Sequence, residues 1–172
     1  MQQLVAALLL WCFCVVPFVR ALPPDTPIPP SQLRTLLGAR GLDVDFLKYD
    51  YEVAAYTTTK MQCLRSYGFT HVRLRTDLDI TNQSFAIVAD RVIQDALNAG
   101  VVPILAKIGD AYKEDPSPAQ LQAYLDWWQA AATRYANYSH RLLFDTMIEP
   151  GVKLSKDYDT LNKFFDSDTK FF

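Results

Sequence analysis

Strand-like and helix-like segments alternate along this chain, and the alternation restricts the possible folds more than any other feature. Short apolar or alternating runs typical of strands are expected over 41–46, 70–75, 101–106 and 142–149. Strands separated by helix-length segments run parallel, through right-handed crossovers. The sequence therefore predicts an α/β fold of about four parallel (β/α) units. These units would form either a small open sheet or the first half of a TIM (β/α)8 barrel, which typically needs roughly 250 residues.

The helices between these strands are marked by apolar spacing and by end signals. The clearest one has apolar residues at three- and four-residue steps from Phe85 to Leu97, and Gly100 closes it. Ser117 and Pro118 form an N-cap followed by proline at the first helical position, which begins another helix. Further helices are expected over 31–37, from 57–59 to 67, and from about residue 158 onward.

The N-terminus has the composition of a targeting segment. The run from Leu4 to Val19 is almost wholly apolar, about the length of a secretory core and short for a bilayer span. We predict a signal peptide over 1–21, cleaved after Ala21, and a secreted, extracellular product; a retained membrane anchor is the alternative. A proline-rich leader is expected over 22–35, followed by the partial barrel domain over 36–172.

Charge and cysteine content exclude several classes of function. Loss of the signal removes Arg20 and changes the formal net charge from −2 to −3, which disfavours nucleic acid as a partner and suits a neutral substrate. Cys63 is then the only cysteine, so neither an internal disulfide nor a Cys/His zinc site is expected. No Gly-x-Gly-x-x-Gly turn is present. We therefore expect no metal, no cofactor and, after signal cleavage, no membrane partner.

Glu149 is the main candidate for chemistry. It follows the apolar run that begins at Leu142, and Pro150 marks where the strand must stop. The carboxyl ends of parallel strands are where ligands bind in such sheets. A carboxylic acid half shielded by the strand behind it can donate a proton there. A plain loop or cap role is the alternative reading.

Several segments together resemble one enzyme family. The segment 68–74 is similar to the "GF-x-x-VR" second strand of glycoside hydrolase family five, the cellulase-type barrels. The segment 98–105 resembles the third unit of that family, in which a helix ending in Ala-Gly leads into an apolar strand. Trp127-Trp128 and then Ile148-Glu149-Pro150 resemble the fourth unit, which ends in the catalytic "NEP". The resemblance extends roughly from Gly38 to Phe165.

The resemblance implies a barrel that cleaves β-linked glucans or related polysaccharides with retention of configuration. Glu149 then corresponds to the acid/base and Arg73 to the arginine that positions the nucleophile. The loop containing Asp110 and Tyr112 would touch the sugar, with the ring of Tyr112 as the better stacking candidate. Two features depart from the family pattern: Ile148 replaces the usual asparagine, and this loop lacks the histidines that many members carry.

The nucleophilic glutamate of the family lies on the seventh strand, whereas this sequence stops in what should be the fourth helix. We therefore expect a truncated chain without glycosidase turnover of its own. Half a barrel has two open sheet edges and, we expect, an apolar face, which favours self-association. Two further hypotheses are an inactive carbohydrate-binding domain that kept the scaffold, and an open α/β domain that binds a protein partner.

Other side chains have competing readings. Asn82 and Asn137 begin glycosylation sequons, which matter only if the host attaches such glycans. Trp128 is expected in the core and Trp127 in partly exposed packing, although the pair could suggest a sugar platform. Lys107, at the end of the third strand, could be the Schiff-base amine of an aldolase-type barrel if it were desolvated in a pocket.

Overall fold

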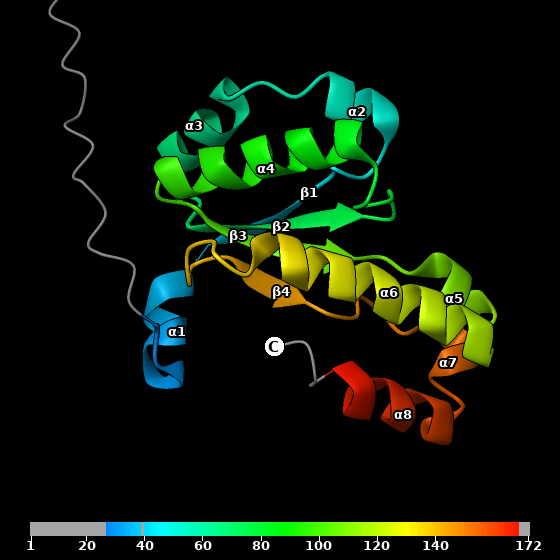
Figure 1. Ribbon diagram of the computed structural model, residues 1–172. Coiled ribbons are helices and arrows are strands. Elements are labelled where there is room, and N and C mark those ends of the chain that lie inside the picture. The colour runs from blue at the N-terminus through cyan, green and yellow to red at the C-terminus, as the bar shows by residue number, and fades with distance from the viewer. Residues whose placement is uncertain (1–26, 39, 169–172) are drawn as a thin grey trace, which may run out of the picture.

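The chain folds around one parallel β-sheet, seen here in a computed structural model that describes residues 27–38 and 40–168. The predicted signal peptide and its cleavage site lie outside these residues. The strand order in the sheet is β1-β2-β3-β4, and every neighbouring pair is parallel. The predicted α/β fold of four consecutive parallel units is therefore confirmed (Figure 1). The strands are β1 (Gly41–Val44), β2 (His71–Thr76), β3 (Val102–Lys107) and β4 (Leu143–Asp145).

Some helices cover one face of the sheet and others lie at its two ends. The helices α3, α4 and α6 cover one face of the sheet, while α1 lies near the end where the strands begin (Figure 1). The short helices α2, α5 and α7 lie at the end where the strands finish. The helices are α1 (Pro30–Leu37), α2 (Asp50–Ala54), α3 (Thr59–Ser66), α4 (Gln83–Asn98), α5 (Asp110–Glu114), α6 (Pro118–Tyr135), α7 (Gly151–Leu154) and α8 (Tyr158–Asp168).

The long helices α4 and α6 both begin at side-chain caps, and the start predicted for α6 is confirmed. The side chain of Asn82 caps α4 by accepting hydrogen bonds from the backbone N–H groups of Ser84 and Phe85. Ser117 caps α6 through the N–H of Gln120, and Pro118 takes the first helical position. The sequence reading missed α2, α5 and α7, because helices of four or five residues are too short to show a periodic pattern.

The core lies between the sheet and the covering helices. In β2 the residues Val72, Leu74 and Thr76 are buried and alternate with half-buried neighbours. Trp128 on α6 is fully buried, as expected. The expectation of partial exposure for Trp127 is wrong, because this side chain keeps only 7% exposure and its indole N–H donates to the carbonyl of Leu78 at 2.9 Å. Both tryptophans therefore belong to the packing of α6 and not to a sugar platform.

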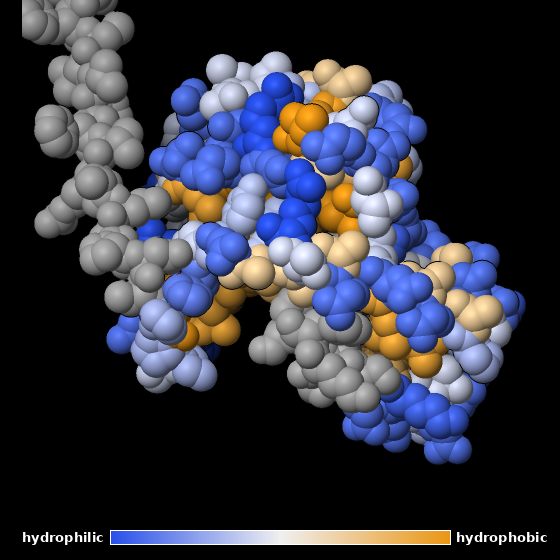
Figure 2. All heavy atoms as spheres, in the orientation of Figure 1, coloured by the Kyte–Doolittle hydropathy of each residue, from blue (hydrophilic) through white to orange (hydrophobic). Residues whose placement is uncertain are grey.

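The face of the sheet opposite these helices is charged. Arg73 and Arg75 alternate with the buried residues of β2, so they project from this face together with Asp43 of β1 and Asp145 of β4. The expectation that half a barrel exposes an apolar face is therefore wrong, because ion pairs occupy the middle of this face. In the view of Figure 2, hydrophobic side chains are visible beside α1, between α6 and α8, and around α4.

Two details complete the scaffold. Pro103 lies within β3, in regular register opposite Val72. The helix α1 is held to the start of β2, where the Thr70 hydroxyl donates to the Leu37 carbonyl and Nδ1 of His71 lies 2.8 Å from the same oxygen.

Within residues 27–38 and 40–168, no helix is both long and apolar enough to cross a membrane.

Candidate functional site

Glu149 lies in the loop that follows β4. The sequence reading placed it at the end of the strand, but β4 ends at Asp145, so Glu149 comes four residues later, before Pro150, the N-cap of α7. Its side chain is exposed, and its φ of 46° falls in the left-handed region that non-glycine residues rarely adopt. A strained backbone at a loop residue persists only where its surroundings enforce it, and such residues cluster at functional sites.

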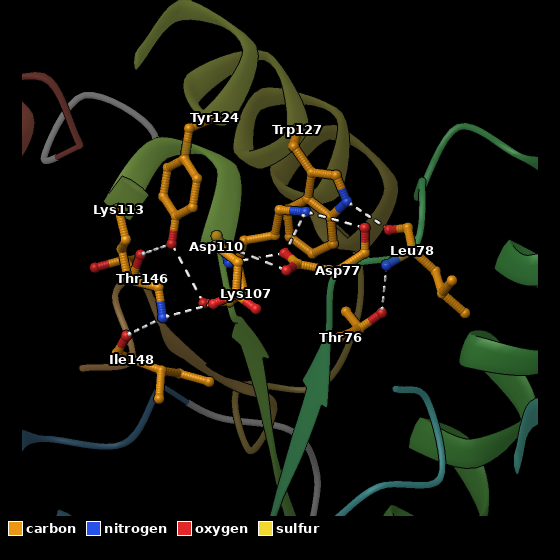
Figure 3. A network of polar contacts seen from close by, with 11 residues as sticks. Thr76, Asp77, Leu78, Lys107, Asp110, Lys113, Tyr124, Trp127, Thr146 and Ile148 are labelled. Atoms are coloured by element: carbon orange, nitrogen blue, oxygen red, sulfur yellow. Dashed lines mark hydrogen bonds and ion pairs between the residues drawn. The ribbon is translucent and has the colours of Figure 1, made fainter. Parts of the chain in front are cut away.

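The surroundings of Glu149 hold the loop on both sides. Ile148 is buried, with 4% exposure, and its carbonyl accepts a hydrogen bond from Nζ of Lys113 at 3.2 Å. The hydroxyl of Tyr124 on α6 lies 2.8 Å from the Thr146 carbonyl and 3.3 Å from the Lys107 carbonyl (Figure 3). One tyrosine thus links the end of β3 to the chain leaving β4. Together, these contacts fix the segment that carries Glu149 at the carboxyl edge of the sheet.

Asp77 braces the loop between β3 and α5. Its carboxylate accepts from the backbone N–H of Gly109 at 2.7 Å and of Asp110 at 3.3 Å, and it pairs with Nζ of Lys107 at 3.0 Å (Figure 3). The Lys107 ammonium also lies 5.0 Å from the centre of the Trp127 ring. The Lys107 amine thus lies against the Asp77 carboxylate and an indole ring, and this arrangement does not fit the Schiff-base reading, which needs a lysine without a charged partner in an apolar pocket.

The two residues expected to touch a sugar lie in different surroundings. Asp110 begins α5; its side chain is 67% exposed and pairs with Lys113 at 3.2 Å. Tyr112 is 1% exposed, and its ring centre lies 5.6 Å from that of Tyr124 and 6.1 Å from that of Phe164. Burial raises the pKa of the Tyr112 hydroxyl, and the nearby charge of Asp157 adds to the effect. The stacking role expected for Tyr112 does not fit this arrangement, because the ring is packed beneath α8.

Arg73 is the centre of an ion-pair network on the helix-free face. Its Nε and Nη2 donate to the two carboxylate oxygens of Asp43 at 2.7 and 2.6 Å, and its Nη1 donates to Asp145 at 3.0 Å. Arg75 continues the network to Asp45 at 2.6 Å. The hydrogen bond to Asp43, more than any other contact, raises the pKa of the Arg73 guanidinium. The arginine is thus oriented by carboxylates from strands on both sides of it.

The structure places Arg73 and Glu149 at different depths along the sheet. Arg73 is the third residue of β2 and is level with Ile104, which in turn pairs with Leu143 at the start of β4. Glu149 lies six residues beyond that level, past the end of the strand. Among the described residues, no hydrogen bond or ion pair joins these two side chains. Arg73 therefore lies near the middle of the sheet, whereas Glu149 lies beyond its carboxyl edge.

We expect the ion pair between Arg73 and Asp43 to make the free energy of unfolding depend on pH. The hydrogen bond from Arg73 lowers the pKa of Asp43 below 3.8 despite the opposing effect of partial burial. A carboxylate with a lowered folded-state pKa stabilises the protein above its unfolded pKa, and this stabilisation is lost as the pH falls towards the folded value. Because Asp43 keeps 38% exposure, the effect should be about 1 kcal/mol or less.

Urea unfolding of the wild type, Asp43→Asn and Arg73→Met at pH 6, 4 and 3 measures this effect. We expect the wild-type free energy of unfolding to fall more steeply below pH 4 than that of either variant. Equal slopes in all three proteins would contradict a stabilising pair.

The sequence reading did not single out Asp43, Asp77 or Asp145. The alternation of Asp43 with apolar neighbours could have placed it on the same face as Arg73, but the pairing of β1 with β2 was needed to set them opposite each other. The sequon residue Asn82 is committed to capping α4, and Asn137 is exposed after α6. Within the described part of the chain, no group of three or more His, Cys, Asp or Glu side chains could hold a metal ion.

No protein-family model matches this sequence, and no curated protein matches it. Solved structures do match the fold. Cel5A of Thermotoga maritima in complex with cellobiose superposes with a TM-score of 0.69 at 21% identity, covering 83% of this chain and 51% of that one. PbGH5A of Prevotella bryantii B14, a glycoside hydrolase family 5 enzyme, gives 0.68 at 17% identity, covering 85% and 53%. A family 5 xyloglucanase from Paenibacillus pabuli gives 0.66 at 22% identity, covering 80% and 47%.

The chain thus spans about half the length of the structures it matches. Four consecutive parallel (β/α) units in this order match the arrangement of the first half of a (β/α)8 barrel. Within that class, the fold is that of the N-terminal half of a glycoside hydrolase family 5 barrel, as the sequence motifs implied.

Proposed function

We propose that this chain is the N-terminal half of a secreted, cellulase-type glycoside hydrolase that acts on β-linked polysaccharide. Glu149 is its acid/base, and Arg73 is the residue that positions the nucleophile. The likeness to cellulase-type barrels such as the Cel5A of Thermotoga maritima, solved in complex with cellobiose, supports the class of substrate. The proposed extracellular location agrees with the apolar N-terminal segment of the sequence.

The observation that carries the proposal is the position of Glu149. It lies in a fixed, strained and exposed loop at the carboxyl edge of a parallel sheet, where a substrate could reach its carboxyl group. A glycosidic oxygen is a poor leaving group, so a carboxylic acid must protonate it as the bond breaks. In a retaining mechanism, the same residue then accepts a proton from the water that attacks the glycosyl-enzyme.

A retaining mechanism also needs a second carboxylate about 5 Å from the first, as nucleophile. Asp43 and Asp145 are the carboxylates on the helix-free face of the described strands, and both are held by Arg73. In the proposed enzyme, Arg73 has donors left for a further carboxylate from a second set of (β/α) units. We propose that this nucleophile comes from those units.

We therefore expect no turnover by the 172-residue chain alone. The test is release of reducing sugar from a soluble β-glucan, with an intact cellulase-type enzyme as the positive control. Release above the buffer background that disappears in Glu149→Gln would refute the expected inactivity but support the role of Glu149. Release that persists in Glu149→Gln would refute both.

The pairing of Arg73 with two aspartates of its own sheet favours a second candidate, a carbohydrate-binding domain without catalysis. A guanidinium already bound by Asp43 and Asp145 is stable without any nucleophile. Retention on an affinity gel containing soluble β-glucan, without any release of reducing sugar, distinguishes this candidate.

Two smaller proposals concern glycosylation and self-association. Glycosidase digestion would test whether glycans are attached at Asn82 and Asn137. Sedimentation analysis would test whether the chain self-associates through the outer edges of β1 and β4.

A further inference from the structure

Two exposed tyrosines stack on each other in the segment that follows β1. The ring centres of Tyr49 and Tyr51 lie 5.3 Å apart with an angle of 9° between the ring planes. Tyr51 is 65% exposed and Tyr49 is 41% exposed. Single exposed aromatic residues are common on protein surfaces, whereas in a stacked pair one ring supports the other and holds its outer face in a fixed orientation. This pair takes no part in the core or in the network around Arg73.

The pair lies at the carboxyl edge of the sheet. β1 ends at Val44, Tyr49 caps α2, and Tyr51 is in its first turn. In Figure 1, α2 lies at the same end of the sheet as α5 and α7, and Glu149 lies two residues before α7. The tyrosine pair and the proposed acid are therefore on the same edge of the sheet, at the ends of its first and fourth strands.

The base of the pair is fixed. Leu47 is fully buried between β1 and Tyr49, and the backbone N–H of Lys48 donates to the carbonyl of Asp45 at 2.9 Å. The Lys48 ammonium lies 4.9 Å from the centre of the Tyr49 ring, a cation–π contact. Asp45 is itself paired with Arg75 at 2.6 Å. The rings are thus presented by a short, well-anchored turn, so little conformational entropy is lost when a ligand covers them.

We propose that Tyr49 and Tyr51 form a stacking platform for a pyranose ring of a β-linked polysaccharide. The proposal rests on the function proposed above and extends it by naming a subsite. The axial C–H groups of such a sugar make its faces apolar, and an aromatic face binds them by dispersion and by attraction between C–H and the π-electrons. Tyr51 carries the larger exposed area, so it supplies most of the contact, while Tyr49 supports it from behind.

The chain provides a closely matched control. Tyr67 is 67% exposed, nearly the same as Tyr51, but it lies between α3 and β2, at the opposite end of the sheet. Binding of a β-1,4-linked glucose hexasaccharide to the full chain is measured by titration calorimetry for the wild type, Tyr51→Ala and Tyr67→Ala. We expect Tyr51→Ala to weaken binding about tenfold and Tyr67→Ala to leave it unchanged.

Each outcome of this experiment decides a separate point. Equal affinity of Tyr51→Ala and the wild type, or an equal loss in Tyr67→Ala, would overturn the platform and leave the proposed function standing. If the wild type bound neither the hexasaccharide nor soluble β-glucan, both the platform and the proposed function would be overturned. Circular dichroism of the variants verifies folding, and shifts of the Tyr51 ring resonances in the wild type during the titration give an independent readout that needs no variant.

Discussion

Replacing Gly109 with alanine is expected to lower the free energy of unfolding by about 2–5 kcal/mol, one of the two largest effects predicted for this protein. Gly109 has a φ of +69°, which costs an L-residue backbone strain. A Cβ atom at this position would also overlap the ring of Tyr124. That ring cannot shift freely, because its hydroxyl contacts the Lys107 and Thr146 carbonyls. The substitution should therefore also loosen the loop that carries Glu149.

Gly100→Ala is the matched control for Gly109→Ala. Gly100 has nearly the same φ, +71°, but the closest atom to an added Cβ would be Nε of Arg65 at 4.0 Å. Gly100→Ala should therefore lower the free energy of unfolding only by the backbone cost, about 1–2 kcal/mol. Urea unfolding followed by circular dichroism measures both variants. Equal losses would show that the contact with Tyr124 contributes nothing to stability.

Phe164→Ala is expected to destabilise the chain by about 3–5 kcal/mol. Phe164 is fully buried and is the residue through which α8 enters the core. Its ring centre lies 5.5 Å from that of Tyr124, edge to face, and 6.1 Å from that of Tyr112. Removing the ring leaves a cavity over both tyrosines. We therefore expect the pKa of Tyr112, which burial raises, to move back towards its ordinary value.

The adjacent residue supplies the control for this prediction. Phe165 is 48% exposed and lies on the same helix, so Phe165→Ala should cost about 1 kcal/mol or less. Urea unfolding gives the two free energies, and ultraviolet absorbance during alkaline titration follows the tyrosines. If both alanine variants were equally stable, α8 would not be docked as described.

The burial of Tyr112 explains why one site prediction did not fit. From the sequence, Tyr112 was an aromatic residue in a loop after a strand, which is a reasonable place for a sugar-stacking ring. The helix α5 turns this ring inward, and Phe164, more than fifty positions later in the chain, covers it. Sequence distance concealed that contact. The exposed aromatic pair at the same edge is Tyr49 and Tyr51, which no periodic pattern or motif had marked.

The ion-pair network around Arg73 could likewise be predicted only in part from the sequence. Arg73 was identified through the resemblance of its strand to a known motif, but the residues that hold it were not. Asp43 lies on the preceding strand and Asp145 on the last one, and the side chain of Arg73 bridges both. These ion pairs replace the apolar face that half a barrel was expected to expose. Charged groups hydrated on an open face cost less than exposed apolar ones, so this face is compatible with water.

The sequence by itself determined the order and type of the main elements and the family whose fold they share. It could do so because hydrophobic period, N-caps and helix-ending glycines are local signals that act within about one to four turns of chain. It also marked Glu149 and Arg73. The tertiary structure alone decided that Glu149 stands beyond its strand, that Tyr112 is buried, and that Arg73 is bound by two aspartates. Each of these depends on contacts between residues distant in the chain, which strand pairing and helix packing create and no local pattern encodes.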